Sequence, residues 1–264
     1  MSGSPSPDSD RRIIVDHVNH TAGLVAADLR ATAPVAAGLP LANMLDAWPA
    51  RVARLNAAAF SIDIDLGAEK PVGVLALART SLGPGDMVAW SAGTLRGGND
   101  LWQGPAVAGA RTGIGFHMAL APAGLVARHL RMTVTTAPAS QHVDIGLIWI
   151  GPGDRPEANM VYGWRLEMED ASRIAVAEAS GAEWVDRGPK RRSLVFDFSM
   201  TAGDRQAAID RLFDRGLTRP VLCVPAPLGD WPREGMIGRI AAHGGFVRTD
   251  PLFHSTSLTI RELL

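Results

Sequence analysis

This chain cannot form an internal disulfide, because it contains a single cysteine, Cys223. A protein without disulfides fits synthesis in a reducing compartment. Cys223 lies in the apolar run Val221–Val224, between neighbours with strong strand propensity. We therefore expect Cys223 to be a small buried hydrophobic residue rather than a reactive thiol.

Long apolar runs and an excess of one charge are also missing. Gly, Pro or a charged residue interrupts every apolar run before it reaches the roughly eighteen residues of a membrane-spanning helix. The formal net charge is -1, which removes the broad attraction that nucleic acids and anionic membranes exert on basic proteins. The first ten residues are rich in Ser, Pro and Asp and do not resemble a secretory signal. We expect synthesis in the cytoplasm, no membrane insertion and no nucleic-acid partner.

Signatures of catalysis are lacking as well. The sequence has no nucleophile elbow, no phosphate-binding loop, no zinc-protease motif and no dinucleotide-binding glycine pattern. Carboxylates without a supporting site carry little information, although Glu167 and Glu169 are the first pair to inspect for a glycosidase. We expect a protein that is not an enzyme, with a polysaccharide-acting enzyme as the remote alternative.

What the sequence does contain is a series of short strand-like runs separated by Gly and Pro, which favours a mainly β fold. Apolar and polar residues alternate strictly from Phe60 to Leu66, and Gly67 is expected to end that strand. The run Val72–Ala78 is almost continuously apolar, as in a strand covered on both faces. We expect these two runs to pair as adjacent antiparallel strands of one sandwich. Further strands are expected at residues 87–92, 127–135 and 143–150.

A second region begins near the segment 152–156, which contains two prolines and a glycine. The alternation from Ser193 to Met200 predicts a strand, and a helix is expected from Thr201 to a stop at Gly216. Shorter strands are expected at residues 221–224, 236–241 and 257–260. The predicted organisation is an N-terminal arm at 1–27, a jelly-roll β-sandwich at 28–153, and a smaller β-rich region with one helix at 154–264.

Several motifs, taken in order, resemble known proteins. The stretch Asn43–Asp46, a strand ending in Asp65-Leu66-Gly67, the following Pro71-Val72 and the later run Ala127–Arg131 resemble a discoidin-like, galactose-binding-type module. Tyr162-Gly163-Trp164, the run Lys190–Leu194, the run Arg219–Pro225 and the C-terminal Leu258–Leu263 resemble tail-associated structural proteins of tailed bacteriophages. The resemblance covers residues 43 to 264.

This resemblance implies a function in assembly. It indicates a structural component of a phage tail or tail tip that is located in the virion, contacts other tail proteins, forms a homo-oligomer and can attach to a host surface. A carbohydrate-binding module that recognises a host glycan is the alternative. The resemblance also implies that Asp46 could contribute to a structural calcium site, and no other cofactor is expected.

Candidate contact residues come from two places in the chain. The chain has seven tryptophans and one tyrosine, and Trp offers a flat surface for stacking on sugars. Trp90 and Trp149 lie in apolar runs and are expected in the core. Trp102 follows a polar Gly/Asn/Asp loop, so Trp102 with Asn99 and Asp100 is the expected ligand-binding group. The basic run Lys190, Arg191 and Arg192 is expected to form a subunit contact.

Two further groups have weaker claims to a role in binding. His17 and His20 would share a face if their segment were helical, but a metal site there is improbable and an arm contacting a neighbouring subunit explains them equally well. Asp63 and Asp65 project from one strand face and could serve acid/base chemistry or bind calcium. Alternation already requires polar residues at these two positions, so the structural interpretation is preferred.

Overall fold

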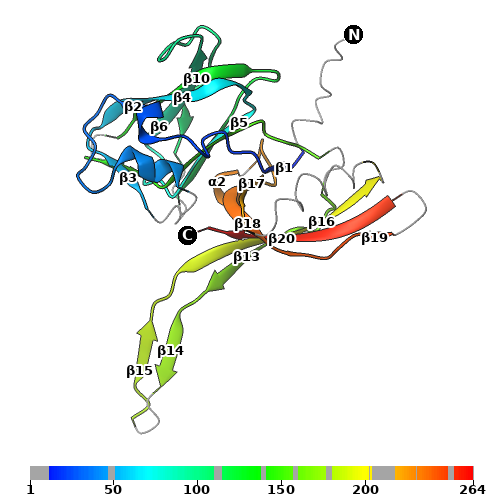
Figure 1. Ribbon diagram of the computed structural model, residues 1–264. Coiled ribbons are helices and arrows are strands. Elements are labelled where there is room, and N and C mark those ends of the chain that lie inside the picture. Colours follow the sequence, from blue (N-terminus) through cyan, green and yellow to red (C-terminus); the bar gives the residue numbers. More distant parts are fainter. Residues whose placement is uncertain are drawn as a thin grey trace. The chain divides into compact units, whose positions relative to one another are not determined.

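The computed structural model describes residues 12–46, 51–109, 115–137, 141–156, 160–176, 180–201, 203, 218–229, 231–248 and 253–263. The fold is mainly β, as the sequence predicts (Figure 1). Within these ranges, no helix has the length and apolar content that crossing a bilayer requires. Most of the helix expected at residues 201–216 lies outside the described residues.

The chain divides into two compact units. Unit 1 comprises Met1–Pro156 and Val221–Ile237, and unit 2 comprises Glu157–Pro220 and Gly238–Leu264. The sequence places one boundary near residue 153, whereas in the structure the chain returns to unit 1 after residue 220. Alternation along single strands carries no information about such a return.

Unit 1 contains a β-sandwich. Its larger sheet has the order β2-β4-β10-β6-β7, with β8 also pairing β6, and its second face consists of the sheet β12-β5-β9 and the pair β11-β3. The bounds of the sheet strands are β2 Leu29–Ala31, β3 Ala53–Leu55, β4 Ala59–Pro71, β5 Val74–Ala78, β6 Met87–Gly93, β7 Trp102–Gln103, β8 Val107–Ala108, β9 Phe116–Leu120, β10 Val126–Thr135, β11 Val143–Ile145 and β12 Leu147–Gly151. Two short 3-10 helices, η2 at Ala26–Asp28 and η3 at Leu41–Leu45, complete this part.

The core lies between these two layers and follows from strand periodicity. Ile62 and Ile64 of β4 are fully buried and belong to one cluster with Leu75 and Leu77 of β5. The fully buried Trp149 and the almost fully buried Trp90 confirm that both tryptophans are interior. Each fully buried large apolar side chain contributes roughly 1.5–3 kcal/mol through removal of its surface from water.

The expected pairing of the runs around Ile62 and Val74 is wrong. β4 pairs with β10 and β2, whereas β5 pairs with β12 and β9 in the opposite layer. Only Val72 and Gly73 separate the two strands, so the chain passes from one sheet to the other without forming a hairpin. Gly73 permits this passage, because a Cβ there would lie 2.0 Å from the carbonyl oxygen of Pro152. Period-two alternation reports which face is buried, and it does not identify the neighbouring strand.

Gly67 does not end its strand as expected. β4 continues to Pro71, and Gly67 adopts a φ of 77° inside it. This backbone conformation is open to glycine at little cost and strained for residues with a side chain. Gly67 therefore marks an irregularity within the strand, next to Asp65.

The segment expected as an N-terminal arm is partly integrated into unit 1. β1 (Ile14–Asp16) pairs antiparallel with β17 (Pro220–Val224), placing Val15 opposite Cys223. Cys223 is fully buried, as predicted, and burial raises the pKa of its thiol well above the usual value. The short helix α2 (Trp231–Glu234) follows β17, and the Trp231 ring packs edge-on against Phe116 at a centroid distance of 6.3 Å.

Unit 2 is built on an antiparallel sheet with the order β18-β20-β16-β13, and β19 also pairs β20. Its strands are β13 Arg165–Asp170, β14 Arg173–Val176, β15 Glu183–Asp186, β16 Lys190–Thr201, β18 Met236–His243, β19 Val247–Arg248 and β20 Phe253–Glu262. Leu194, Phe196, Phe198 and Met200 are buried on one face of β16, which confirms the alternation predicted there. β14 and β15 form a separate two-stranded ribbon that projects beyond the end of β13 (Figure 1).

Candidate functional site

A cluster of charged side chains lies on the outer face of the larger sheet of unit 1. Ile62 and Ile64 point into the core, so the intervening Asp63 and the following Asp65 point outward. The register places Asp65 opposite His129 and Asp63 opposite Arg131 on the neighbouring strand β10. The two aspartates that the sequence places on one strand face are therefore part of a cross-strand charged network.

An irregularity in the pairing of β4 with β10 determines which side chains reach this network. Ala127 pairs with Lys70 and His129 with Asp65, so Arg128 alone lies opposite residues 66–69, and the extra residues belong to β4. Ala127 and Leu130 are buried, whereas both Arg128 and His129 lie outside the core. A regular strand would put only one of two consecutive residues on this face. The irregular pairing thus brings an arginine and a histidine side by side next to Asp65.

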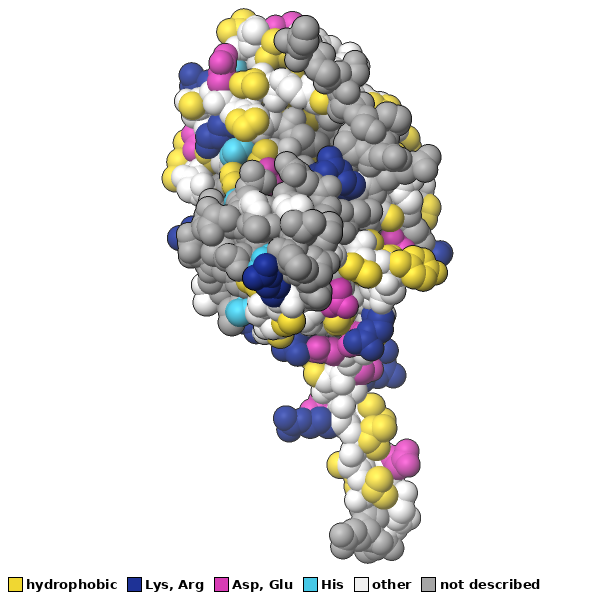
Figure 2. Space-filling view, turned by 90° about the vertical axis from the view of Figure 1, so that its right-hand side faces the viewer, with side chains coloured by type: hydrophobic (Ala, Val, Ile, Leu, Met, Phe, Trp, Pro, Cys, Tyr) yellow, Lys and Arg dark blue, Asp and Glu magenta, His cyan; other side chains and the backbone are white. Residues whose placement is uncertain are grey.

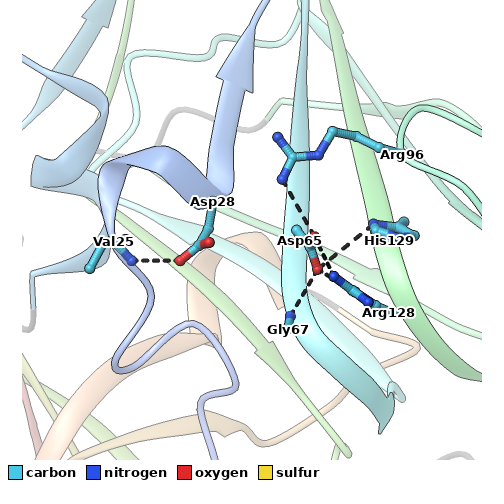
Figure 3. A network of polar contacts seen from close by, with 7 residues as sticks. All are labelled: Val25, Asp28, Asp65, Gly67, Arg96, Arg128 and His129. Carbon is cyan, nitrogen blue, oxygen red and sulfur yellow. Dashed lines mark hydrogen bonds and ion pairs between the residues drawn. The ribbon is translucent and has the colours of Figure 1, made fainter.

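Asp65 is the centre of the cluster (Figure 3). Its carboxylate accepts two hydrogen bonds from Arg128, from Nε at 2.8 Å and from Nη2 at 3.0 Å. The Gly67 N–H donates to the same carboxylate at 2.9 Å, and Arg96 Nη2 lies 3.5 Å away. His129 Nδ1 lies 3.8 Å from Asp65 Oδ1, a contact that becomes an ion pair when the imidazole is protonated. The hydrogen bonds from Arg128 hold the pKa of Asp65 well below its usual range, so this carboxylate is ionised.

A second ion pair, between Arg131 and Asp63, lies beside the contacts of Asp65 and holds the β6–β7 loop in place. Arg131 donates from Nε and Nη2 to Asp63 at 2.6 and 3.1 Å, and this bonding raises the pKa of Arg131. The β6–β7 loop approaches so closely that a Cβ on Gly97 would lie 2.5 Å from Arg131 Nη2. Gly97 has a φ of 82°, which also favours glycine. The loop is therefore held against the charged face, and it delivers Arg96 to Asp65.

The three residues predicted to bind a ligand lie in or next to this loop. Asp100 accepts hydrogen bonds from the Thr94 main chain and hydroxyl, and these bonds lower the pKa of Asp100. Asn99 donates Nδ2 to Gln103 Oε1 at 3.2 Å. Asn99 and Asp100 are exposed and stabilise the loop that carries Arg96.

Trp102, the third residue of the expected ligand-binding group, lies in a strand next to this loop. It belongs to β7, pairs with the fully buried Ala92 and packs partly buried against the hydrophobic core. Residues directly opposite in a sheet share a face, so the indole lies on the core side and not on the face of Asp65. Stacking of a sugar on Trp102 stays a prediction.

Other predicted residues have structural partners elsewhere. Arg192 is buried and pairs with Glu262 within the chain, and a subunit contact through its side chain stays a prediction. Lys190 pairs with Asp170 and is exposed, and Arg191 is partly exposed, so for these two residues the subunit contact stays a prediction.

The carboxylates proposed for catalysis are also paired. Glu167 lies 3.7 Å from Arg165, and Glu169 lies 2.9 Å from Arg261. Both glutamates belong to β13, which is the last strand of the sheet of unit 2. An enzymatic role for this pair has no support in their surroundings.

His17 and His20 do not meet in the structure. His20 Nε2 lies 2.9 Å from the Pro71 carbonyl oxygen, and His17 Nδ1 lies 3.2 Å from Asp154. Asp16, His17 and Asp154 have donor atoms within 4.8 Å of one another, but the Asp16 carboxylate already accepts bonds from main-chain N–H groups and the Trp149 indole. Burial raises the pKa of Asp16 to about 6. This group fastens the N-terminal segment to β12, so we assign it a structural role.

The calcium candidate Asp46 follows η3 and lies 3.6 Å from Arg51 Nη1. This ion pair involves an arginine that is largely exposed, so it adds little stability. The structural calcium implied by the resemblance stays a prediction.

No family model matches the sequence, and no curated protein matches it. Solved structures similar to the chain include a fucose-binding module of Streptococcus pneumoniae, at 10% identity and a TM-score of 0.39 over 52% of this chain and 96% of that chain. The family 32 carbohydrate-binding module of NanJ from C. perfringens, in complex with galactose, gives 10% identity and a TM-score of 0.37 over 52% and 98%. The lectin domain of lectinolysin complexed with Lewis B antigen gives 13% and 0.39 over 51% and 96%. TM-scores below 0.5 at these identities do not establish a ligand for this chain.

Proposed function

We propose that unit 1 recognises a saccharide through the outer-face cluster of Asp65, Arg96 and Arg128. The observation that carries this proposal is the irregular pairing of β4 with β10, beside which Arg128, His129 and Arg96 all lie against the carboxylate of Asp65. Bulges are frequent next to binding sites because they redirect side chains.

The chemistry of the cluster suits hydroxyl groups. A guanidinium carries five N–H donors in a rigid plane, and Asp65 occupies only part of this set on Arg128. The Arg128 side chain is 48% exposed and that of Arg96 32%, so both present donors to solvent from fixed positions. The exposed Asn99 and Asp100 add acceptors at the loop. Saccharide recognition depends on such pre-positioned polar groups.

A glycan array probed with the full chain tests this proposal. The wild-type protein should bind a set of host-surface glycans, and Arg128→Ala and Arg96→Ala should each lose at least ten-fold in affinity. Arg54→Ala is the matched control, because Arg54 forms an equivalent two-bond pair with Asp144 at 2.7 and 2.8 Å and is 37% exposed. Absence of binding by the wild type, or equal losses in Arg54→Ala and Arg128→Ala, would refute the proposal.

The second candidate function is assembly as a structural component of a phage tail or tail tip. It is supported by the ordered motifs from Tyr162 to Leu263 and by the fully exposed Tyr162 with its exposed neighbour Val161. The two functions are compatible, because a tail protein can carry a host-recognition module. Immunogold electron microscopy of phage particles tests it: label at the tail or its tip is expected, and particles without label would contradict the assignment.

A further inference from the structure

The projecting ribbon of unit 2 carries apolar side chains on the surface. Among the described residues, a large share of the exposed large hydrophobic side chains lies between residues 161 and 185, namely Val161, Tyr162, Leu166, Met168, Ile174, Val176, Trp184 and Val185. Figure 2 shows hydrophobic side chains exposed along this ribbon. A two-stranded hairpin alone is at best marginally stable in water. The ribbon therefore needs further strands or a covering surface.

The two strands of the ribbon present different faces. Ile174 is opposite Val185 and Val176 is opposite Glu183, so these four side chains share one face. Ala175 is opposite Trp184 on the other face, next to the cross-strand pair of Arg173 and Asp186. Trp184 is 60% exposed and Ile174 is 66% exposed. Both faces of the ribbon thus contain exposed apolar groups.

The free edges of the ribbon differ in their protection against pairing. Exposed edge strands normally carry charges that discourage another strand from adding to them. β15 follows this rule, because two of its four residues, Glu183 and Asp186, are acidic. β14 contains no acidic residue and has only Arg173 as a charge. The edge of β14 is therefore open to pairing.

We propose that β14 pairs antiparallel with β14 of a second copy of this chain, around a two-fold axis at Ala175. This inference is independent of the proposed saccharide site. The argument for a second copy is self-complementarity. In this register Ile174 lies opposite Val176 of the second copy and the reverse, and Ala175 lies opposite its own counterpart, so no like charges meet.

The pairing would also complete the ribbon. It creates a four-stranded sheet with the order β15-β14-β14-β15, and three or more strands with an apolar face can be stable. One face collects Ile174, Val176 and Val185 from both copies. On the other face, the two copies of Ala175 lie side by side at the centre, with one Trp184 on each side of them. Each indole can therefore pack over the small alanine next to it. Because the contact is small, the dimer should be weak and concentration-dependent.

Sedimentation of the full chain over a concentration series tests the association. The wild type should approach twice the chain mass of 28.0 kDa as concentration rises, whereas Ile174→Glu and Val176→Glu should remain monomeric. Val247→Glu is the matched control in unit 2, because Val247 of β19 is 58% exposed and Val176 is 57% exposed. All three side chains are exposed within a single chain, so the substitutions should leave the fold intact. A wild type that stays monomeric at the highest concentration overturns the proposal.

Cysteine scanning tests the register. Cys223 is buried, so an introduced cysteine is the accessible thiol. Opposite residues of an antiparallel pair have Cβ atoms about 4.5–5.5 Å apart, which small movements bring within disulfide range. Oxidation should cross-link Ala175→Cys most, Ile174→Cys and Val176→Cys less, and Val247→Cys not at all. A maximum at Trp184→Cys, on the other strand, would overturn the β14 pairing.

Discussion

Removing the guanidinium of Arg192 should destabilise unit 2 strongly. Arg192 donates to Glu262 Oε2 from its main-chain N–H at 3.2 Å and from Nε at 3.0 Å, and Nη2 contacts Oε1. Only 8% of the Arg192 side chain and 4% of the Glu262 side chain are exposed. Arg192→Ala leaves a buried carboxylate without its counter-charge, and breaking such a pair costs about 3–5 kcal/mol.

Urea unfolding followed by far-ultraviolet circular dichroism measures this cost. With a slope of about 1–3 kcal/mol per molar urea, the transition of unit 2 should shift down by at least about 1 M. The double variant Arg192→Met with Glu262→Leu removes both charges and should recover most of the loss, because well-packed apolar replacements of buried ion pairs are often neutral or stabilising. A loss below about 1 kcal/mol for Arg192→Ala, together with a changed oligomeric mass, would refute the burial argument. That result would instead support a contact between the Arg192 side chain and a neighbouring subunit.

Three other perturbations follow from the structure. Burial raises the pKa of Asp16 to about 6, so between pH 4 and 6 the folded protein holds a proton that the unfolded chain releases. The unfolding free energy should therefore fall by up to about 3 kcal/mol as pH rises through this window. Asp16→Asn should lack that component in pH-dependent denaturation. Gly97→Ala should cost about 1–2 kcal/mol in thermal unfolding, from its positive φ and the contact with Arg131, and a neutral result would contradict the loop geometry. Cys223 should resist thiol reagents until the chain unfolds, so rapid labelling in native buffer would contradict its burial.

Strand positions could be predicted from the sequence because burial on one face leaves a period-two pattern. The run from Phe60 and the run from Ser193 both became strands. The partner of each strand could not be predicted, since the alternating run around Ile62 and the continuously apolar run around Val74 are both strands and still belong to opposite layers. The burial of Arg192 could have been predicted from the sequence, because Arg192 lies two residues before Leu194, on the face that the alternation identifies as buried.

The candidate site was only partly predictable. Asp63 and Asp65 could be assigned to one outward face, and Asn99 and Asp100 to a loop. Arg128 was missed because the alternation of β10 is interrupted at Arg128 and His129. The signal was present as two consecutive polar residues, Arg128 and His129, between buried neighbours. Arg96 reaches Asp65 only through the fold of the β6–β7 loop, which strand patterning does not describe.

Calorimetric titration of the wild type, Arg128→Ala and Arg54→Ala with the best glycan from an array tests the central claim most directly. We expect saturable binding by the wild type and by Arg54→Ala, and at least ten-fold weaker binding by Arg128→Ala. Equal affinities for all three proteins would mean that the cluster around Asp65 stabilises the sheet and binds no saccharide.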